Sequence, residues 1–374
     1  MEVVVNKRRA NHLLDVLVGR YKEKVFPFNL PAAYVPQELI PPSIRDDALT
    51  LGRFLFFVCT YMRGGIESHT AFRQLIRMWE AHPELFIPRE AMRMTEDAIV
   101  PILREYIGWD ADNAGRFWRI NAERLERGWG GDPRALIQNL TSYDEVIRRI
   151  AYKPSSTKKP LSLDPNDEGF IGFQHKMASL LIYFYDWEGW LKPRFLYPSP
   201  ADFHHYRLFI ANEAVMVTMD EGREIRYHEK VSGVIRDLTL EYLEKTGADP
   251  IDLADAIWLY SLLLCGESPA TVVNGAPKEI LPLFAEGDEG RSGDSAWSAG
   301  QLKRLMRTCG ACPLQDTCVY AIPSQPYYRR GTLLLWERER PPLILPPHAR
   351  EPKVAAPDEE VEEAGQKAFS FSAE

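Results

Sequence analysis

Long apolar runs are missing from this chain of 374 residues. No stretch approaches the roughly 18 consecutive apolar residues of a membrane span, and the N-terminal segment MEVVVNKRR lacks the charged and then apolar order of a secretory signal. We therefore expect a cytoplasmic protein with no membrane partner. The 45% hydrophobic content is ordinary for a globular protein, and the length suffices for one large core or for two domains.

A surplus of positive charge is absent too, because 53 acidic residues outnumber 45 basic ones. Many of the acids lie in residues 266–300, which we predict to be a flexible insertion, and in a tail over residues 341–374, which we predict to be disordered. The remainder of the chain is nearly neutral. This distribution argues against a strongly basic surface for nucleic acid but permits contact through local patches.

Strand-like runs of alternating apolar residues are scarce, whereas apolar residues recur at helical spacing through most of the sequence. This pattern predicts an all-α fold. The expected helices cover residues 6–21, 47–62, 68–81, 96–106, 112–126, 133–139, 143–151, 175–185, 202–217, 233–246, 252–265 and 300–308.

Cysteine is rare, and its five copies are unevenly placed. Cys309, Cys312 and Cys318 form the pattern C-x2-C-x5-C, and Cys265 ends an expected helix upstream. Such crowding is typical of a metal centre rather than of a disulfide framework, and it suits an iron–sulfur cluster or, alternatively, zinc. The fifth cysteine, Cys59, lies in an apolar run and is expected in the core.

Two further patterns place charged residues at expected helix starts. Lys176 follows Gly172 by four positions and begins an apolar helix, and Asp202 begins the next helix in the order Asp-x-His-x-x-Arg. A helix start and an apolar environment both disfavour an ammonium, which favours a nucleophilic amine. An N-cap carboxylate can stabilise a developing sugar cation. The same positions also suit a surface lysine and a simple helix cap.

The order of these motifs resembles that of the helix-hairpin-helix DNA glycosylases of the endonuclease III type, which carry a [4Fe-4S] cluster. The resemblance spans about residues 45–320 in element order. It implies a two-lobed all-α fold, in which residues 45–196 form a six-helix barrel with the helix-hairpin-helix element. Residues 1–44 and 197–335 form the cluster lobe. We expect a monomer whose partner is damaged duplex DNA.

The resemblance also implies roles for individual residues. Lys176 is the expected nucleophile of a base-excision N-glycosylase with an abasic-site lyase step, and Asp202 is its electrostatic and general-base partner. The expected cluster ligands are Cys265, Cys309, Cys312 and Cys318. Contact with DNA is expected from Gly172, Gln174, His175, Arg304 and Arg307. Reading of the target base is expected from Tyr61, Arg63 and His204.

The sequence departs from the family at two points. Gln174 stands where the family has its second hairpin glycine, and 43 residues separate Cys265 from Cys309, which are close in the family. Two other functions therefore stay open. One is an N-glycosidase of a free or RNA-borne modified nucleoside. The other is a non-catalytic iron–sulfur protein that binds nucleic acid and in which Lys176 and Asp202 are structural.

Overall fold

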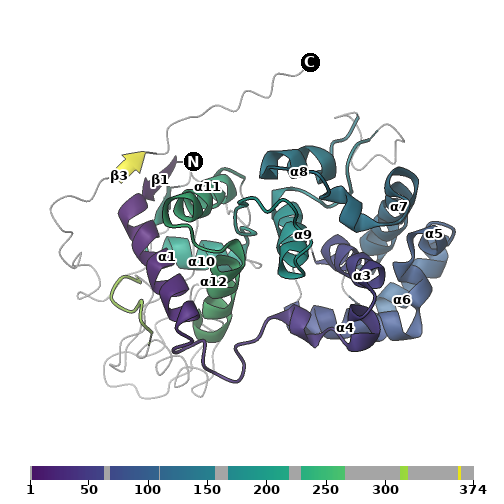
Figure 1. Ribbon diagram of the computed structural model, residues 1–374, viewed down its shortest axis with the longest axis horizontal. Helices are drawn as coiled ribbons and strands as arrows, with labels where there is room; N and C mark the ends of the chain where they lie inside the picture. The colour runs from purple at the N-terminus through teal and green to yellow at the C-terminus, as the bar shows by residue number, and fades with distance from the viewer. Residues whose placement is uncertain are drawn as a thin grey trace, which may run out of the picture. The chain divides into compact units, whose positions relative to one another are not determined.

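The computed structural model describes residues 2–62, 68–108, 110–155, 167–218, 229–265, 312–318 and 361–363. The chain divides into two compact units (Figure 1). Unit 1 comprises residues 1–33 and 201–374, and unit 2 comprises residues 34–200. Most regular structure is helical, as the spacing of apolar residues predicts. The expected insertion at 266–300 and the helix expected at 300–308 lie outside the described residues.

Unit 2 is built from helices around α3, which is buried along most of its length. Its elements are η1 Pro36–Leu39, α2 Pro42–Arg45, α3 Ala48–Tyr61, α4 Ser68–Ala81, η2 Pro83–Phe86, α5 Pro88–Ala91, α6 Glu96–Tyr106, α7 Ala111–Trp129, η3 Pro133–Leu136, α8 Tyr143–Ile150 and α9 His175–Trp187. A helix that is apolar on every side belongs in the middle of a core, and α3 contacts both α7 and α9.

Aromatic side chains fill the core of unit 2. The ring of Phe57 stacks on Trp118 with centroids 4.5 Å apart, and Phe56 stacks on Phe173 at 5.3 Å. The indole nitrogen of Trp118 donates to the carbonyl of Leu85 over 2.7 Å, which satisfies its one polar atom. Because Phe173 lies just before α9, this packing fixes the approach to that helix. The buried Cys59 belongs to the same helix as Phe57, and its expected core position is confirmed.

The segment between α8 and α9 is held by side chains of α7. Asn121 is fully buried; its amide donates to the carbonyl of Ile171 over 2.9 Å and its carbonyl accepts from the Ile171 N–H over 2.8 Å. Arg124 donates to the carbonyl of Gly169 over 2.7 Å. Gly169 has φ 70°, and a Cβ there would lie 2.1 Å from the carbonyl oxygen of Ala151, so only glycine fits. We call residues 167–174 the hairpin.

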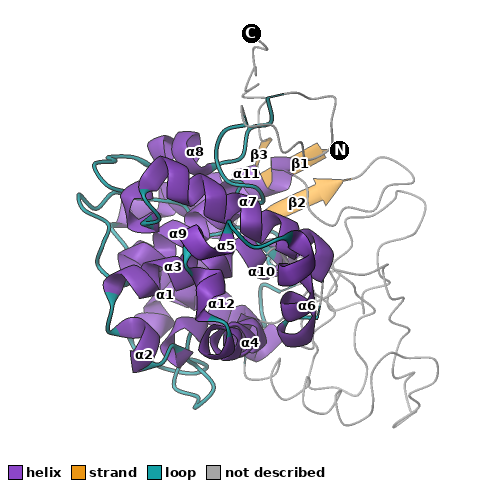
Figure 2. Ribbon diagram, turned by 90° about the vertical axis from the view of Figure 1, so that its right-hand side faces the viewer, coloured by secondary structure: helices purple, strands orange, loops and turns teal. Residues whose placement is uncertain are grey.

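Unit 1 joins the start of the chain to its later part. Its elements are β1 Glu2–Asn6, α1 Lys7–Lys22, α10 Phe203–Ala211, β2 Val215–Thr218, α11 Glu229–Thr246, α12 Pro250–Cys265 and β3 Val361–Glu363. Helix α12 packs against α1 and α10. The strands form an antiparallel sheet in the order β2-β1-β3, with α11 against β1 and β2 (Figure 2). Among the described residues, no helix has both the length and the apolar character needed to cross a bilayer.

The sheet corrects two expectations. The helix predicted over residues 202–217 is wrong beyond Ala211, because Glu213 takes a left-handed φ of 55° and the next residues form β2. The β-branched run at residues 3–5 pairs with this strand, and such residues favour a pleated, half-buried surface. Part of the tail that was expected to be disordered, residues 361–363, forms β3.

Replacing Asn121 with alanine should destabilise unit 2 by about 2–4 kcal/mol, because both backbone groups of Ile171 then lose their buried partner. Urea denaturation measures this loss. Asn113→Ala on the same helix is the control, since Asn113 is exposed, and it should change the free energy of unfolding by less than about 0.5 kcal/mol. Equal effects of the two substitutions would contradict the role assigned to Asn121.

Candidate active site and metal centre

Lys176 lies in the first turn of α9, as predicted. The turn before the helix contains Gly172 with φ 85°, and Gln174 is the N-cap in an extended conformation. Lys176 is half-buried, while most residues after it in α9 are buried. Burial raises the pKa of the nearby Cys59 thiol well above its ordinary range, and the charge of Lys176 opposes that shift.

The residues around Lys176 are engaged within the hairpin and its flanking helices. The hydroxyl of Tyr143 lies 3.2 Å from Nδ1 of His175 and accepts a hydrogen bond from Ser179 over 3.0 Å. Gln174 donates its side-chain amide to the carbonyl of Tyr152 over 3.0 Å. The side chain of Gln174 therefore joins the end of the hairpin to Tyr152. Its expected contact with a phosphate stays a prediction.

Asp202 is the N-cap of α10, which confirms the expected helix start. Its Oδ1 accepts from the backbone N–H of His204 over 2.9 Å and of His205 over 3.4 Å. The ring Nδ1 of His205 lies 2.9 Å from the same oxygen. The side chain of Asp202 is 15% exposed, so it is held firmly but is not sealed from solvent. Asp202 and Lys176 belong to different units, and their convergence on one substrate stays a prediction.

Several other expected site residues are either buried or lie outside the described residues. His204 is buried, and its Nδ1 lies 2.9 Å from the hydroxyl of Ser261 on α12, which is the environment of a packing residue. Tyr61 is only 1% exposed, so a base-reading role would require it to leave the core. Arg63, Arg304 and Arg307 lie outside the described residues.

Residues 312–318, which we call the cysteine loop, contact two helices of unit 1. The thiol of Cys312 lies 3.1 Å from the hydroxyl of Tyr260 on α12, the helix that ends at Cys265. Thr317 donates to the side-chain carbonyl of Asn212, the C-cap of α10, over 2.7 Å. The thiol of Cys312 is thus brought to α12 although 46 residues separate Cys312 from Cys265 in the sequence.

The iron–sulfur or zinc site expected from the cysteines stays a prediction. Cys312 and Cys318 lie in one short loop, and burial raises the pKa of Cys312. A metal would bind the thiolate and reverse that shift. Within the described residues, no three His, Cys, Asp or Glu side chains gather as metal ligands do. The thiol of Cys265 and the whole of Cys309 lie outside those residues.

The sequence gives no sign of the side chains that hold the hairpin. Asn121 and Arg124 read as polar positions of an amphipathic helix, and Asp167 reads as a loop residue. In the structure Asp167 accepts from the hydroxyl of Tyr152 over 2.7 Å and from the N–H of Ser155 over 2.7 Å. A signal exists only for Gly169, since a glycine that follows two acidic residues and precedes an apolar run marks a turn with a special backbone conformation.

Anaerobically purified protein should contain about four irons per chain if the cysteines hold a [4Fe-4S] cluster. Cys312→Ser and Cys318→Ser should each lower the iron content and bleach the visible absorption. Cys59→Ala is the control and should keep both, because Cys59 is buried in unit 2. Stoichiometric zinc without iron would select the zinc alternative, and absence of both metals would contradict a metal centre.

Comparison of the chain with protein-family models and with curated proteins finds no match.

Proposed function

We propose that the protein is a base-excision DNA N-glycosylase with an abasic-site lyase step. The start of α9 is the observation that carries this proposal. Gly172 turns the chain in a left-handed conformation, and Lys176 follows in the first turn of a helix that packs on α3. Helix α8 contacts α9, and residues 151–174, which join the two helices, end in the hairpin. This arrangement supports a helix-hairpin-helix element.

Lys176 acts as the nucleophile. Its Nζ attacks C1′ of the deoxyribose, and the base leaves with the electron pair of the C1′–N bond and takes up a proton. Opening of the sugar ring then converts the new C1′–Nζ bond into a protonated Schiff base. Water hydrolyses this intermediate to an abasic site and the free lysine. Alternatively, loss of a C2′ proton expels the 3′-phosphate by β-elimination.

Asp202 stabilises the cationic sugar. A carboxylate that is already fixed by helix N–H groups needs no reorganisation when positive charge develops in front of it. The cysteines would hold a cluster or zinc ion that joins the loop at Cys312 to the end of α12. Such a group would supply structural stability to unit 1 rather than chemistry on the sugar.

A second candidate is favoured by Gln174. Its side chain is engaged with Tyr152, and the family's second hairpin glycine, which allows close approach to a phosphate, is missing. An N-glycosidase that uses the same two residues on a free or RNA-borne modified nucleoside would not need that approach.

Borohydride should trap a covalent adduct between the protein and abasic DNA. Lys176→Ala and Lys176→Arg should abolish the adduct, because neither side chain can form a Schiff base, and arginine also keeps the positive charge for DNA binding. Lys245→Ala replaces an exposed lysine of α11 and should leave trapping unchanged. An undiminished adduct in both Lys176 variants would rule out this nucleophile. Release of bases from nucleosides without an adduct would favour the second candidate.

Asp202 allows capping and catalysis to be separated. Asparagine is as good an N-cap as aspartate, so Asp202→Asn should preserve stability but lower the rate of base release at least about tenfold through loss of the charge. Asp202→Ala should in addition cost about 1 kcal/mol of stability. Thermal unfolding and single-turnover kinetics measure the two effects. Full activity of Asp202→Asn would leave Asp202 only its structural role.

A further inference from the structure

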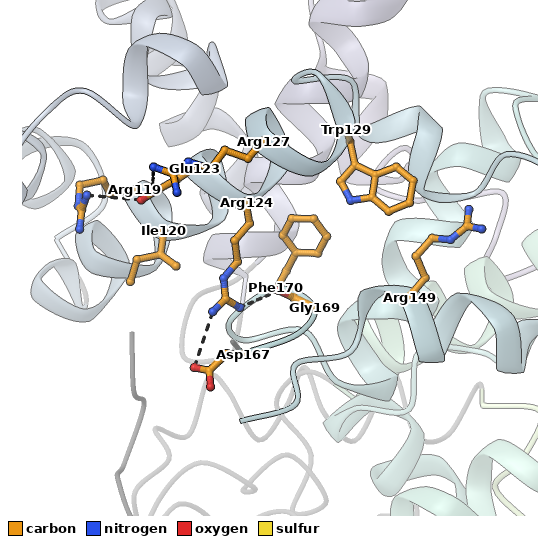
Figure 3. Close-up of a pocket in the computed structure, with 10 residues that line it drawn as sticks. All are labelled: Arg119, Ile120, Glu123, Arg124, Arg127, Trp129, Arg149, Asp167, Gly169 and Phe170. Atoms are coloured by element: carbon orange, nitrogen blue, oxygen red, sulfur yellow. Dashed lines mark hydrogen bonds and ion pairs between the residues drawn. The ribbon is translucent and has the colours of Figure 1, made fainter. Parts of the chain in front are cut away.

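A cavity of about 370 Å³ lies between α7 and the base of the hairpin in unit 2 (Figure 3). Arg119, Arg124 and Arg127 line one wall from α7, and Gly169 and Phe170 of the hairpin line the facing wall. Trp129, at the end of α7, and Arg149, from α8, complete it. The residues proposed above for catalysis are not part of its lining.

Positive charge dominates this pocket. Four guanidiniums face two carboxylates, Glu123 and Asp167, which leaves a surplus of two positive charges in a chain whose net charge is negative. The side chain of Asp167 is fully buried, accepts hydrogen bonds from Tyr152 and Ser155, and lies 3.7 Å from the guanidinium of Arg124, so its charge offsets that of Arg124. Glu123 is shared between Arg127 at 2.6 Å and Arg119 at 3.8 Å.

Two arginines of the pocket, Arg124 and Arg149, are held in place by hydrogen bonds to backbone carbonyls. Arg124 donates to the carbonyl of Gly169, and its side chain is only 18% exposed. Arg149 donates to the carbonyls of Leu136 and Gln138 over 3.2 and 3.1 Å, and its guanidinium lies 5.2 Å from the ring of Trp129. Side chains that are already fixed lose little conformational entropy when an anion binds.

The pocket is also larger and more apolar than a bare oxyanion needs. Its volume lies within the range of small-molecule sites, and the partly exposed Trp129 contributes apolar surface beside the cations, whereas the lining residues Ile120 and Phe170 are almost fully buried. Aromatic and guanidinium planes are the groups on which nucleobases stack. Cations that suit a phosphate and a flat apolar surface that suits a base therefore occur in one pocket.

We propose that this pocket binds a nucleoside 5′-monophosphate unit, either as a free nucleotide or at the phosphorylated end of a nucleic acid strand. The guanidiniums of α7 hold the phosphate, and the apolar surface around Trp129 takes the base. Glu123 competes with the phosphate for Arg119 and Arg127, and this competition sets the affinity. The site does not depend on Lys176 or Asp202.

Isothermal titration calorimetry with adenosine 5′-monophosphate tests this site. Adenosine and inorganic phosphate should each bind at least about tenfold more weakly, because each lacks one half of the recognised unit. Arg127→Gln should weaken binding of the nucleotide about tenfold, and Glu123→Gln should strengthen it about threefold by removing the competing carboxylate. A misfolded variant cannot gain affinity, so the second substitution separates binding from folding.

Arg104→Gln is the matched control, because Arg104 is an exposed arginine of α6 that also pairs with a carboxylate, Asp112. It should leave affinity unchanged. A short oligonucleotide with a 5′-phosphate that binds more tightly than its 5′-hydroxyl form identifies a strand end as the ligand, and binding of the mononucleotide alone identifies a free nucleotide. No binding of either at millimolar concentration, or equal losses in Arg104→Gln and Arg127→Gln, overturns the proposal.

Discussion

The paired hydrogen bonds between Asn121 and Ile171 are the contact on which the described site most depends. They join the middle of α7 to the hairpin and satisfy both backbone groups of a fully buried residue. On one side of this contact the chain turns through Gly172 into α9, which carries Lys176. On its other side, Gly169 and Phe170 form a wall of the pocket that the arginines of α7 line. One amide side chain therefore sets the geometry of two separate surfaces.

The acidic net charge does not decide what unit 2 can bind. The electrostatic field near a surface depends on the charges within about 10 Å of it at moderate salt, because more distant charges are screened. Arg124 and Arg127 are three residues apart and are neighbours on the surface of α7, and Arg119 lines the same pocket from earlier in that helix. A protein with a net charge of −8 can thus offer a local cationic site.

Local signals predicted the helix starts well, and long-range pairing was not predictable. Gly172 followed by an apolar run indicated the start of α9, and the side chain of Asp202 indicated the cap of α10. The pairing of residues 2–6 with β2 could not be predicted from the sequence. Each strand is too short to show an alternating pattern, and the two strands lie more than 200 residues apart in the chain. The pocket lined by the arginines of α7 could not be predicted for a related reason, since its two walls come from separate segments that only the fold brings together.

Unit 1 is discontinuous, because unit 2 is inserted between its α1 and its α10. Helix α1 and strand β1 have their packing partners, α12 and β2, far downstream in the chain. During synthesis on the ribosome, unit 2 is therefore complete and can fold before α12, the packing partner of α1, has been made. The apolar face of α1, with Leu13, Leu14 and Leu17, is the surface that a chaperone would have to cover in that interval.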